Sequence, residues 1–314
     1  DAGHQGFTGK EVNPMLIPAI WTGMYAELPL PEALRTLHAN DWRCFEMSSE
    51  HLVWLDRCED SQARIAESQR TIDSLQITMP QAHAKLVADV AQPDLEKRRI
   101  DIEEVERHIT ICAQLGVKCV VVHPGFAEGF TNEQEKRQLL AINKDSFTRL
   151  ADHAGSLGLK IGIENGLGMT MRNGAARLAA DAEGLIELVK TIDHPAIGVT
   201  IDTSHGNVNT GDVPGTVRQL GSLICCTHIS DNDRSGDQHR TPGNGTINWQ
   251  DVVAAFREIG YQGIYNLEIP GERHANLNMR WLKTRHAREV TEWLVAEMNG
   301  APIQLPGMAQ ANPV

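Results

Sequence analysis

The sequence predicts an α/β protein, a (β/α)8 barrel built from eight successive strand-and-helix units. Short β-rich runs alternate with longer amphipathic segments along the chain, a pattern typical of βα units and a parallel sheet. No G-x-G-x-x-G motif follows any of the strand-like runs, which disfavours an open, doubly wound dinucleotide-binding sheet. We therefore expect one barrel domain over residues 1–314, with an irregular C-terminal extension, rich in Pro, Gly and Ala, over about 300–314.

The eight expected strands follow one another at regular intervals. In order, they cover Met15–Trp21, Trp42–Met47, Gln76–Met79, Lys118–His123, Lys160–Glu164, Ile197–Asp202, Ile224–Ser230 and Gly263–Glu268. Gly116, Gly158 and Gly260 each stand shortly before one of these strands. Helix C-caps favour glycine because it adopts a positive φ without strain, so these positions mark helix-to-strand junctions.

Helical periodicity fills the intervals between the strands. The clearest helix is expected over Asp101–Leu115, where Ile102, Val105 and Ile109 recur at steps of three and four residues. Glu104 falls among the charged residues of the opposite face, which we expect to meet solvent. This pattern is that of a helix in the outer ring of a barrel.

Composition narrows the classes of partner. The chain is 41% hydrophobic, 22% charged and carries a formal net charge of -12, with its Lys and Arg residues scattered, so we expect no nucleic-acid partner. No run approaches the roughly 20 apolar residues of a membrane-spanning helix, so we expect no membrane partner. Barrels of this kind often associate, which leaves a homo-oligomer open. The chain begins at Asp1 rather than Met, so processing of the N-terminus stays open beside the cytoplasmic location that we expect.

The six cysteines lack the dense, regular spacing of a disulfide scaffold, which favours free thiols in a reducing compartment. Cys225 and Cys226 are adjacent on an expected strand. Successive side chains of a strand point to opposite faces, so we expect these two residues to diverge and to form no metal clip.

The residues that suggest chemistry stand at the C-terminal ends of four consecutive strands, the face on which barrel enzymes build their sites. They are Glu164, Asp202, His228 and Glu268. Singly, each has an ordinary explanation, since a strand-end carboxylate is often a helix N-cap and a strand histidine is often a hydrogen-bonded core residue. Together they predict a site for one divalent cation, Mn, Mg, Co or Zn, which would also hold three carboxylates close together.

A second tier of residues is expected around this site, with substrate binding, or for His205, Asp237 and His239 also metal binding, as the functional interpretation and ordinary packing or solvation as the alternative. The histidines His83, His123 and His205 follow or end strands, while Asp237 and His239 lie in the loop after the seventh strand. Arg234 and Arg240 of the same loop offer paired hydrogen bonds to substrate oxygens, and Trp21 offers an apolar wall for a sugar.

At these residues the sequence resembles the xylose isomerase-like barrel superfamily, which includes sugar isomerases and epimerases, inosose dehydratases and endonuclease IV. The similarity covers about Met15 to Leu294 and is most specific at five places: 163–165, 202–205, 228–231, 242–249 and Glu268. The resemblance implies that Glu164, Asp202, His228 and Glu268 bind one divalent cation. It also implies that the two glutamates exchange protons with substrate and that His205 holds a substrate oxygen.

The resemblance thus implies a metal-dependent sugar isomerase or epimerase that moves a proton through a metal-stabilised cis-enediolate of a ketose or related polyol. A first alternative is a lyase, a dehydratase or an enzyme that cleaves a sugar from an aglycone. A second is a trinuclear zinc phosphodiesterase like endonuclease IV, whose ligands match this chain in type and order at His83, His123, Glu164, Asp202, His205, His228, Asp237, His239 and Glu268. The acidic surface disfavours that alternative, because a DNA-repair enzyme must hold a phosphate backbone.

Overall fold

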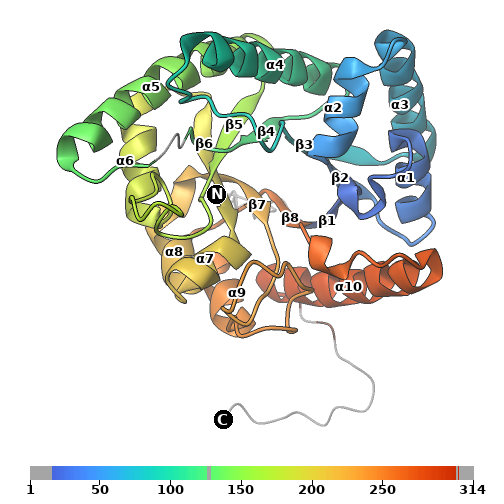
Figure 1. Cartoon of the computed structure of the whole chain (residues 1–314). Coiled ribbons are helices and arrows are strands. Elements are labelled where there is room, and N and C mark those ends of the chain that lie inside the picture. The colour runs from blue at the N-terminus through green and yellow to red at the C-terminus, as the bar shows by residue number, and fades with distance from the viewer. Residues whose placement is uncertain (1–15, 126–128, 302, 304–314) are drawn as a thin grey trace, which may run out of the picture.

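Eight parallel strands form the centre of the molecule and helices surround them (Figure 1). The computed structural model describes residues 16–125, 129–301 and 303. The strands are β1 (Ile17–Trp21), β2 (Cys44–Met47), β3 (Thr78–His83), β4 (Cys119–Val122), β5 (Lys160–Glu164), β6 (Ile197–Asp202), β7 (Ile224–His228) and β8 (Ile264–Leu267).

The helices lie between successive strands and after the last one. They are α1 (Leu30–His38), α2 (Ser49–Arg57), α3 (Ser61–Leu75), α4 (Leu95–Gln114), α5 (Glu133–Ser156), α6 (Ala182–Ile192), α7 (Thr203–Asn209), α8 (Val213–Leu220), α9 (Trp249–Glu258) and α10 (Leu277–Met298). Three short 3-10 turns, η1 (Thr22–Tyr25), η2 (Gly221–Leu223) and η3 (Pro270–Glu272), complete the connections.

The sheet runs in the order β7-β6-β5-β4-β3-β2-β1-β8, so each strand from β1 to β6 pairs with the next one in the chain and β1 also pairs with β8. The last gap, between β7 and β8, is bridged where the backbone N–H of Ile229 donates to Asn266 O at 2.8 Å and that of Glu268 donates to Ile229 O at 3.2 Å. The predicted (β/α)8 barrel is confirmed.

Side-chain caps begin several of the outer helices, among them α4, α5 and α6. At the start of α6 the Asp181 side chain accepts from the backbone N–H of Gly184, and Leu185, Leu188 and Ile192 are buried along one face of that helix. Gly116, Gly158 and Gly260 have φ of 77°, 75° and 64°, as predicted for helix-to-strand junctions. None of the described helices is both long and apolar enough to cross a membrane.

Two local predictions are wrong. The third strand was expected over Gln76–Met79, but Gln76 caps α3 with φ 52° and the strand runs on to His83. A register shift in the β2–β3 pairing accommodates Pro80, which lacks an N–H for a regular ladder. Glu104 was expected in solvent, but it is 4% exposed because Arg57 of α2 and Lys85 close over it as ion-pair partners.

Candidate metal centre

Four side chains converge where strands β5 to β8 end. Glu164, Asp202 and His228 are the last residues of β5, β6 and β7, and Glu268 directly follows β8. Each offers a ligand atom, and these four atoms all lie within 4.8 Å of one another. The parallel barrel brings them together because its strands end at the same rim. We call these four residues the central cluster.

His228 lies among the three carboxylates of the central cluster. Its Nδ1 is 2.8 Å from Glu164 Oε1, 3.4 Å from Glu268 Oε2 and 4.0 Å from Asp202 Oδ2. All four residues are buried, with at most 8% of any of them exposed. The arrangement is a compact, water-poor set of one imidazole and three carboxylates.

The central cluster fits a divalent cation. Asp202 Oδ2 is buried and has no hydrogen-bond partner, although a buried carboxylate oxygen is costly to leave unpaired. Three carboxylates in one buried place also repel one another unless a positive charge lies between them. Carboxylate and imidazole ligands suit Mg, Mn, Co or Zn. The unpaired Asp202 oxygen and the types of the four ligands are therefore both consistent with a bound cation at this place.

A second group lies on one side of the central cluster and shares Glu164 with it. His83 at the end of β3 places Nε2 3.3 Å from Glu164 Oε2, and His123, just after β4, places Nε2 3.0 Å from the same oxygen. The ligand atoms of the three residues lie within 4.8 Å of one another. His123 is 27% exposed at its side chain, so this group opens toward the barrel mouth.

A third group lies on the other side and shares Asp202. It contains His205 of α7 and His239 of the loop after β7. Asp237 joins the two histidines, with Oδ2 3.5 Å from His205 Nε2 and Oδ1 2.8 Å from His239 Nε2. The three groups thus form one continuous row of ligands across the barrel mouth.

The carboxylates of this row of ligands raise the pKa values of its histidines, as expected where negative charges lie close together. Burial acts to lower the pKa of His205, but Asp202, Asp237 and Glu164 outweigh it and raise that pKa to about 9. Burial also acts to lower the pKa values of His228 and His239. The surrounding carboxylates outweigh it and raise both pKa values well above normal. Without metal, protons supply the positive charge that a bound cation would otherwise provide.

The two glutamates of the central cluster are pushed in opposite directions. Burial would raise the pKa of Glu164, but contacts with His228, His123 and His83 hold it well below normal. Burial raises the pKa of Glu268, and His228 and His239 only partly oppose this. Two carboxyl groups with divergent pKa values in one site are suited to act as base and acid.

Glu46 was not predicted from the sequence, although its carboxylate contacts His228 of the central cluster. It is fully buried in β2, and its Oε1 lies 3.0 Å from His228 Nε2. Its Oε2 accepts from the amides of Gln81, at 2.8 Å, and Asn266. A lone acid in the apolar segment 44–47 was the available signal, since a buried carboxylate requires polar partners.

The loop after β7 is organised around Asp231. This carboxylate accepts from the backbone N–H groups of Gly243, Gly245 and Ile247 and from Trp249 Nε1 at 2.8 Å. These contacts explain the polar run at 242–249 and fix the loop that carries Asp237 and His239.

The remaining predicted substrate ligands lie elsewhere on the loop or in the core. Arg240 pairs with Asp233 at 3.4 Å, and the Arg234 guanidinium packs against the backbone of Gly211. Trp21 is 4% exposed and its ring lies 4.4 Å below the Arg273 guanidinium. The structure does not bring these three side chains into the row of ligands, so their role in substrate binding stays a prediction.

Comparison with known proteins agrees with this fold. A family model described as "Xylose isomerase-like TIM barrel" matches residues 28–290. Among solved structures, a D-tagatose 3-epimerase-like protein superposes with a TM-score of 0.72 and 23% identity, over 90% of this chain and 99% of its own. At that identity the likeness shows the fold.

Three curated relatives show the range of names in the family. An uncharacterized protein of Methanocaldococcus jannaschii, MJ1311, is 30% identical over 59% of this chain and 62% of its own. A D-psicose 3-epimerase of Agrobacterium fabrum is 26% identical over 52% and 54%, and a probable endonuclease 4 of Acholeplasma laidlawii is 24% identical over 56% and 64%. The chain thus spans less than two thirds of each of these relatives.

Proposed function

We propose that this chain, which belongs to the xylose isomerase-like TIM barrel family, is a divalent-metal-dependent sugar isomerase or epimerase that acts on a ketose or related polyol. The observation that carries the proposal is the pair Glu164 and Glu268, which reach one buried place from the non-adjacent strands β5 and β8 with pKa values displaced in opposite directions. The epimerase names of a relative and of a structural neighbour support the same class of reaction.

The residues of the central cluster would hold the cation, which when bound polarises a substrate carbonyl and acidifies the adjacent C–H. Glu164, whose lowered pKa keeps it ionised, removes that proton. The resulting enediolate is protonated by Glu268, the carboxyl group of the pair whose pKa burial raises. Return to the same carbon from the opposite face gives an epimer, and return to the neighbouring carbon gives an isomer.

His205 would orient the substrate above this pair. Asp202, Asp237 and Glu164 outweigh burial and raise its pKa, which favours the imidazole form that donates a hydrogen bond to a sugar oxygen. Its Nδ1 already lies 2.8 Å from Asn165 O, which leaves Nε2, on the Asp237 side, for the substrate. Asp237 and His239 would close the rim around it.

The proposal is tested by incubating the metal-loaded protein with a panel of ketoses in deuterated water and following products by NMR. Proton transfer predicts deuterium at the carbon next to the carbonyl, together with an epimeric or isomeric sugar. Loss of water or of an aglycone from the substrate would instead identify the lyase alternative, because the enediolate would then expel a leaving group. No exchange and no product with any sugar would contradict the proposed class.

A second candidate function, phosphodiester hydrolysis, is favoured by one specific observation. The groups around His83 and His239 extend the central cluster into a row that offers three neighbouring cation places. A probable endonuclease 4 is also among the relatives. The net charge of -12 disfavours a nucleic-acid substrate, so this function ranks second. It predicts three tightly bound zinc ions and cleavage of a phosphodiester that is lost in His83→Ala.

A further inference from the structure

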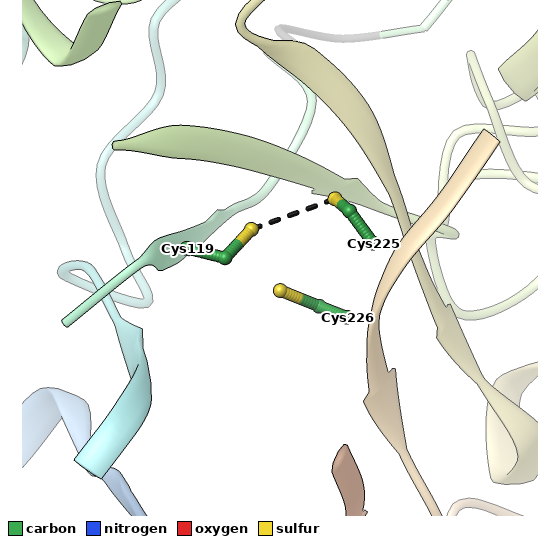
Figure 2. Close-up of side chains that lie close together, drawn as sticks. All are labelled: Cys119, Cys225 and Cys226. Carbon is green, nitrogen blue, oxygen red and sulfur yellow. Dashed lines mark hydrogen bonds between the residues drawn. The ribbon is translucent and has the colours of Figure 1, made fainter. Parts of the chain in front are cut away.

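Three cysteines meet inside the barrel at the opposite end of the strands from the central cluster. Cys119 begins β4, and Cys225 and Cys226 lie near the start of β7. Their sulfur atoms lie within 4.8 Å of one another, and the Cys119 and Cys225 sulfurs are 3.5 Å apart. Figure 2 shows the three side chains pointing toward a common centre. We call them the thiol cluster.

The convergence of two adjacent cysteines corrects the expectation that they would diverge. In the pairing of β6 with β7, Val199 lies opposite Ile224 but Thr200 lies opposite Cys226, so Cys225 is an extra residue at a register shift. Such a bulge turns neighbouring side chains toward the same side of the strand. Both sulfurs thereby reach Cys119 across the intervening strands β5 and β6.

Two paired glycines make room for this arrangement. Gly162 of β5 and Gly198 of β6 are register partners directly beneath Cys225. A Cβ on Gly198 would lie 2.6 Å from the Cys225 sulfur, and one on Gly162 would lie 3.3 Å from it. Glycine weakens strands and is used inside them where another group comes close to the backbone. Here that group is the Cys225 side chain.

We propose that Cys119, Cys225 and Cys226 form a second metal site, which takes a thiol-preferring cation of the Cu(I) or Zn(II) class. Thiolates select such soft cations, and three sulfurs bound to one ion at ~2.3 Å lie about 4 Å apart, so sulfurs that already lie within 4.8 Å of one another need only a small adjustment to bind one ion. Among the described residues the group has these three members, which favours three-coordinate Cu(I) over tetrahedral Zn(II). On binding, the thiols release their protons to solvent.

The surroundings allow a cation to enter. Cys225 is only half-buried, whereas the other two cysteines are buried, so the cluster is reached through Cys225. The hydrogen bond from Cys119 lowers the pKa of Cys225, and Lys160 lowers it further.

The test is a titration of the reduced full-length protein with Cd²⁺, followed by the ultraviolet thiolate-to-cadmium charge-transfer band. The carboxylates and imidazoles of the central cluster cannot produce this band, so the two sites are distinguished even if both bind cadmium. We expect one saturating equivalent per chain from the thiol cluster. Competition with Zn²⁺ and with Cu(I) then shows which cations of this class displace Cd²⁺ from the cluster.

Variants assign the band to the cluster. Cys225→Ser should weaken Cd²⁺ binding by more than about tenfold, as should Cys119→Ala, which retains apolar packing if the serine variant folds poorly. Cys58→Ser is the matched control, since Cys58 is also half-buried but lies at the end of α2. An absent band in the wild type, or a band unchanged in a folded Cys225→Ser variant, would overturn the proposal, whatever the activity at the barrel mouth.

Discussion

His228 and Glu46 are joined inside the barrel by a contact of 3.0 Å between Nε2 and Oε1. The other ring nitrogen of His228 faces the three carboxylates of the central cluster. Glu46 therefore keeps the proton on Nε2 and leaves Nδ1 free to bind a cation. In most metal-binding histidines the other ring nitrogen likewise donates to a carboxylate or a carbonyl. Glu46 acts on the site through His228 and is a positioning residue.

Replacement of Glu46 by Gln tests this relationship. A neutral amide orients the imidazole less firmly and makes it a weaker ligand, so we expect the affinity for the divalent cation to fall about 10- to 100-fold. Isothermal titration calorimetry measures that change, with Glu67→Gln on α3, whose side chain is 39% exposed, as the control. Equal affinities in the two variants would show that Glu46 only fills space in the core.

Glu164→Gln and Glu268→Gln test the assignment of base and acid. Each should lower kcat by about 10²- to 10⁴-fold, the usual contribution of a general acid or base, with the far-UV spectrum unchanged. Glu289→Gln on the exposed face of α10 should leave kcat unaffected. Activity close to wild type in both variants would remove the two glutamates from the mechanism.

His108 predicts a pH dependence of folding that is independent of the central cluster. This histidine is fully buried in α4 and neither ring nitrogen forms a hydrogen bond. Burial lowers its pKa from 6.5 to about 4, although Asp56 Oδ2 lies 3.8 Å from Nε2. Between pH 6.5 and about 4, His108 is therefore protonated in the unfolded chain but neutral in the folded chain. The contribution of neutral His108 to the free energy of unfolding is therefore present above pH 6.5. It falls by about 3 kcal/mol as the pH drops to 4.

Chemical denaturation at several pH values measures this effect against His108→Leu, which has no proton to bind. The free energy of unfolding of the wild type should fall by about 3 kcal/mol more than that of the variant over this pH range. Parallel curves for the two proteins would show that His108 is protonated in the folded state.

Asp231→Ala should destabilise the loop after β7. The change leaves the N–H groups of Gly243 and Gly245 and the indole N–H of Trp249 without their acceptor. The N–H groups of Ile247 and Trp249, both buried, lose the same acceptor, and each unsatisfied buried donor costs about 1–3 kcal/mol, so we expect a loss of about 2 kcal/mol or more in the free energy of unfolding. Urea denaturation followed by tryptophan fluorescence measures it, with Asp233→Ala on the exposed part of the loop as control.

The parts of the site that the sequence predicts are those that strand order decides. Glu164, Asp202, His228 and Glu268 end or follow consecutive strands, and a parallel barrel must gather such residues at one rim. The convergence of Cys225 on Cys119 depends instead on a one-residue bulge, which leaves no mark in the local sequence. The directions of Arg234 and Arg240 depend on loop contacts with Gly211 and Asp233, which strand and helix patterns do not determine.

The metal content of the purified protein tests the central claim most directly. Elemental mass spectrometry on protein prepared without added metal, and again after loading, should find about one Mn, Mg, Co or Zn per chain that is lost in Asp202→Asn and Glu268→Gln. Cys225→Ser, measured in parallel, separates this ion from any cation held by the thiol cluster. About three zinc ions per chain would favour phosphodiester hydrolysis, and no divalent metal under any condition would contradict the account.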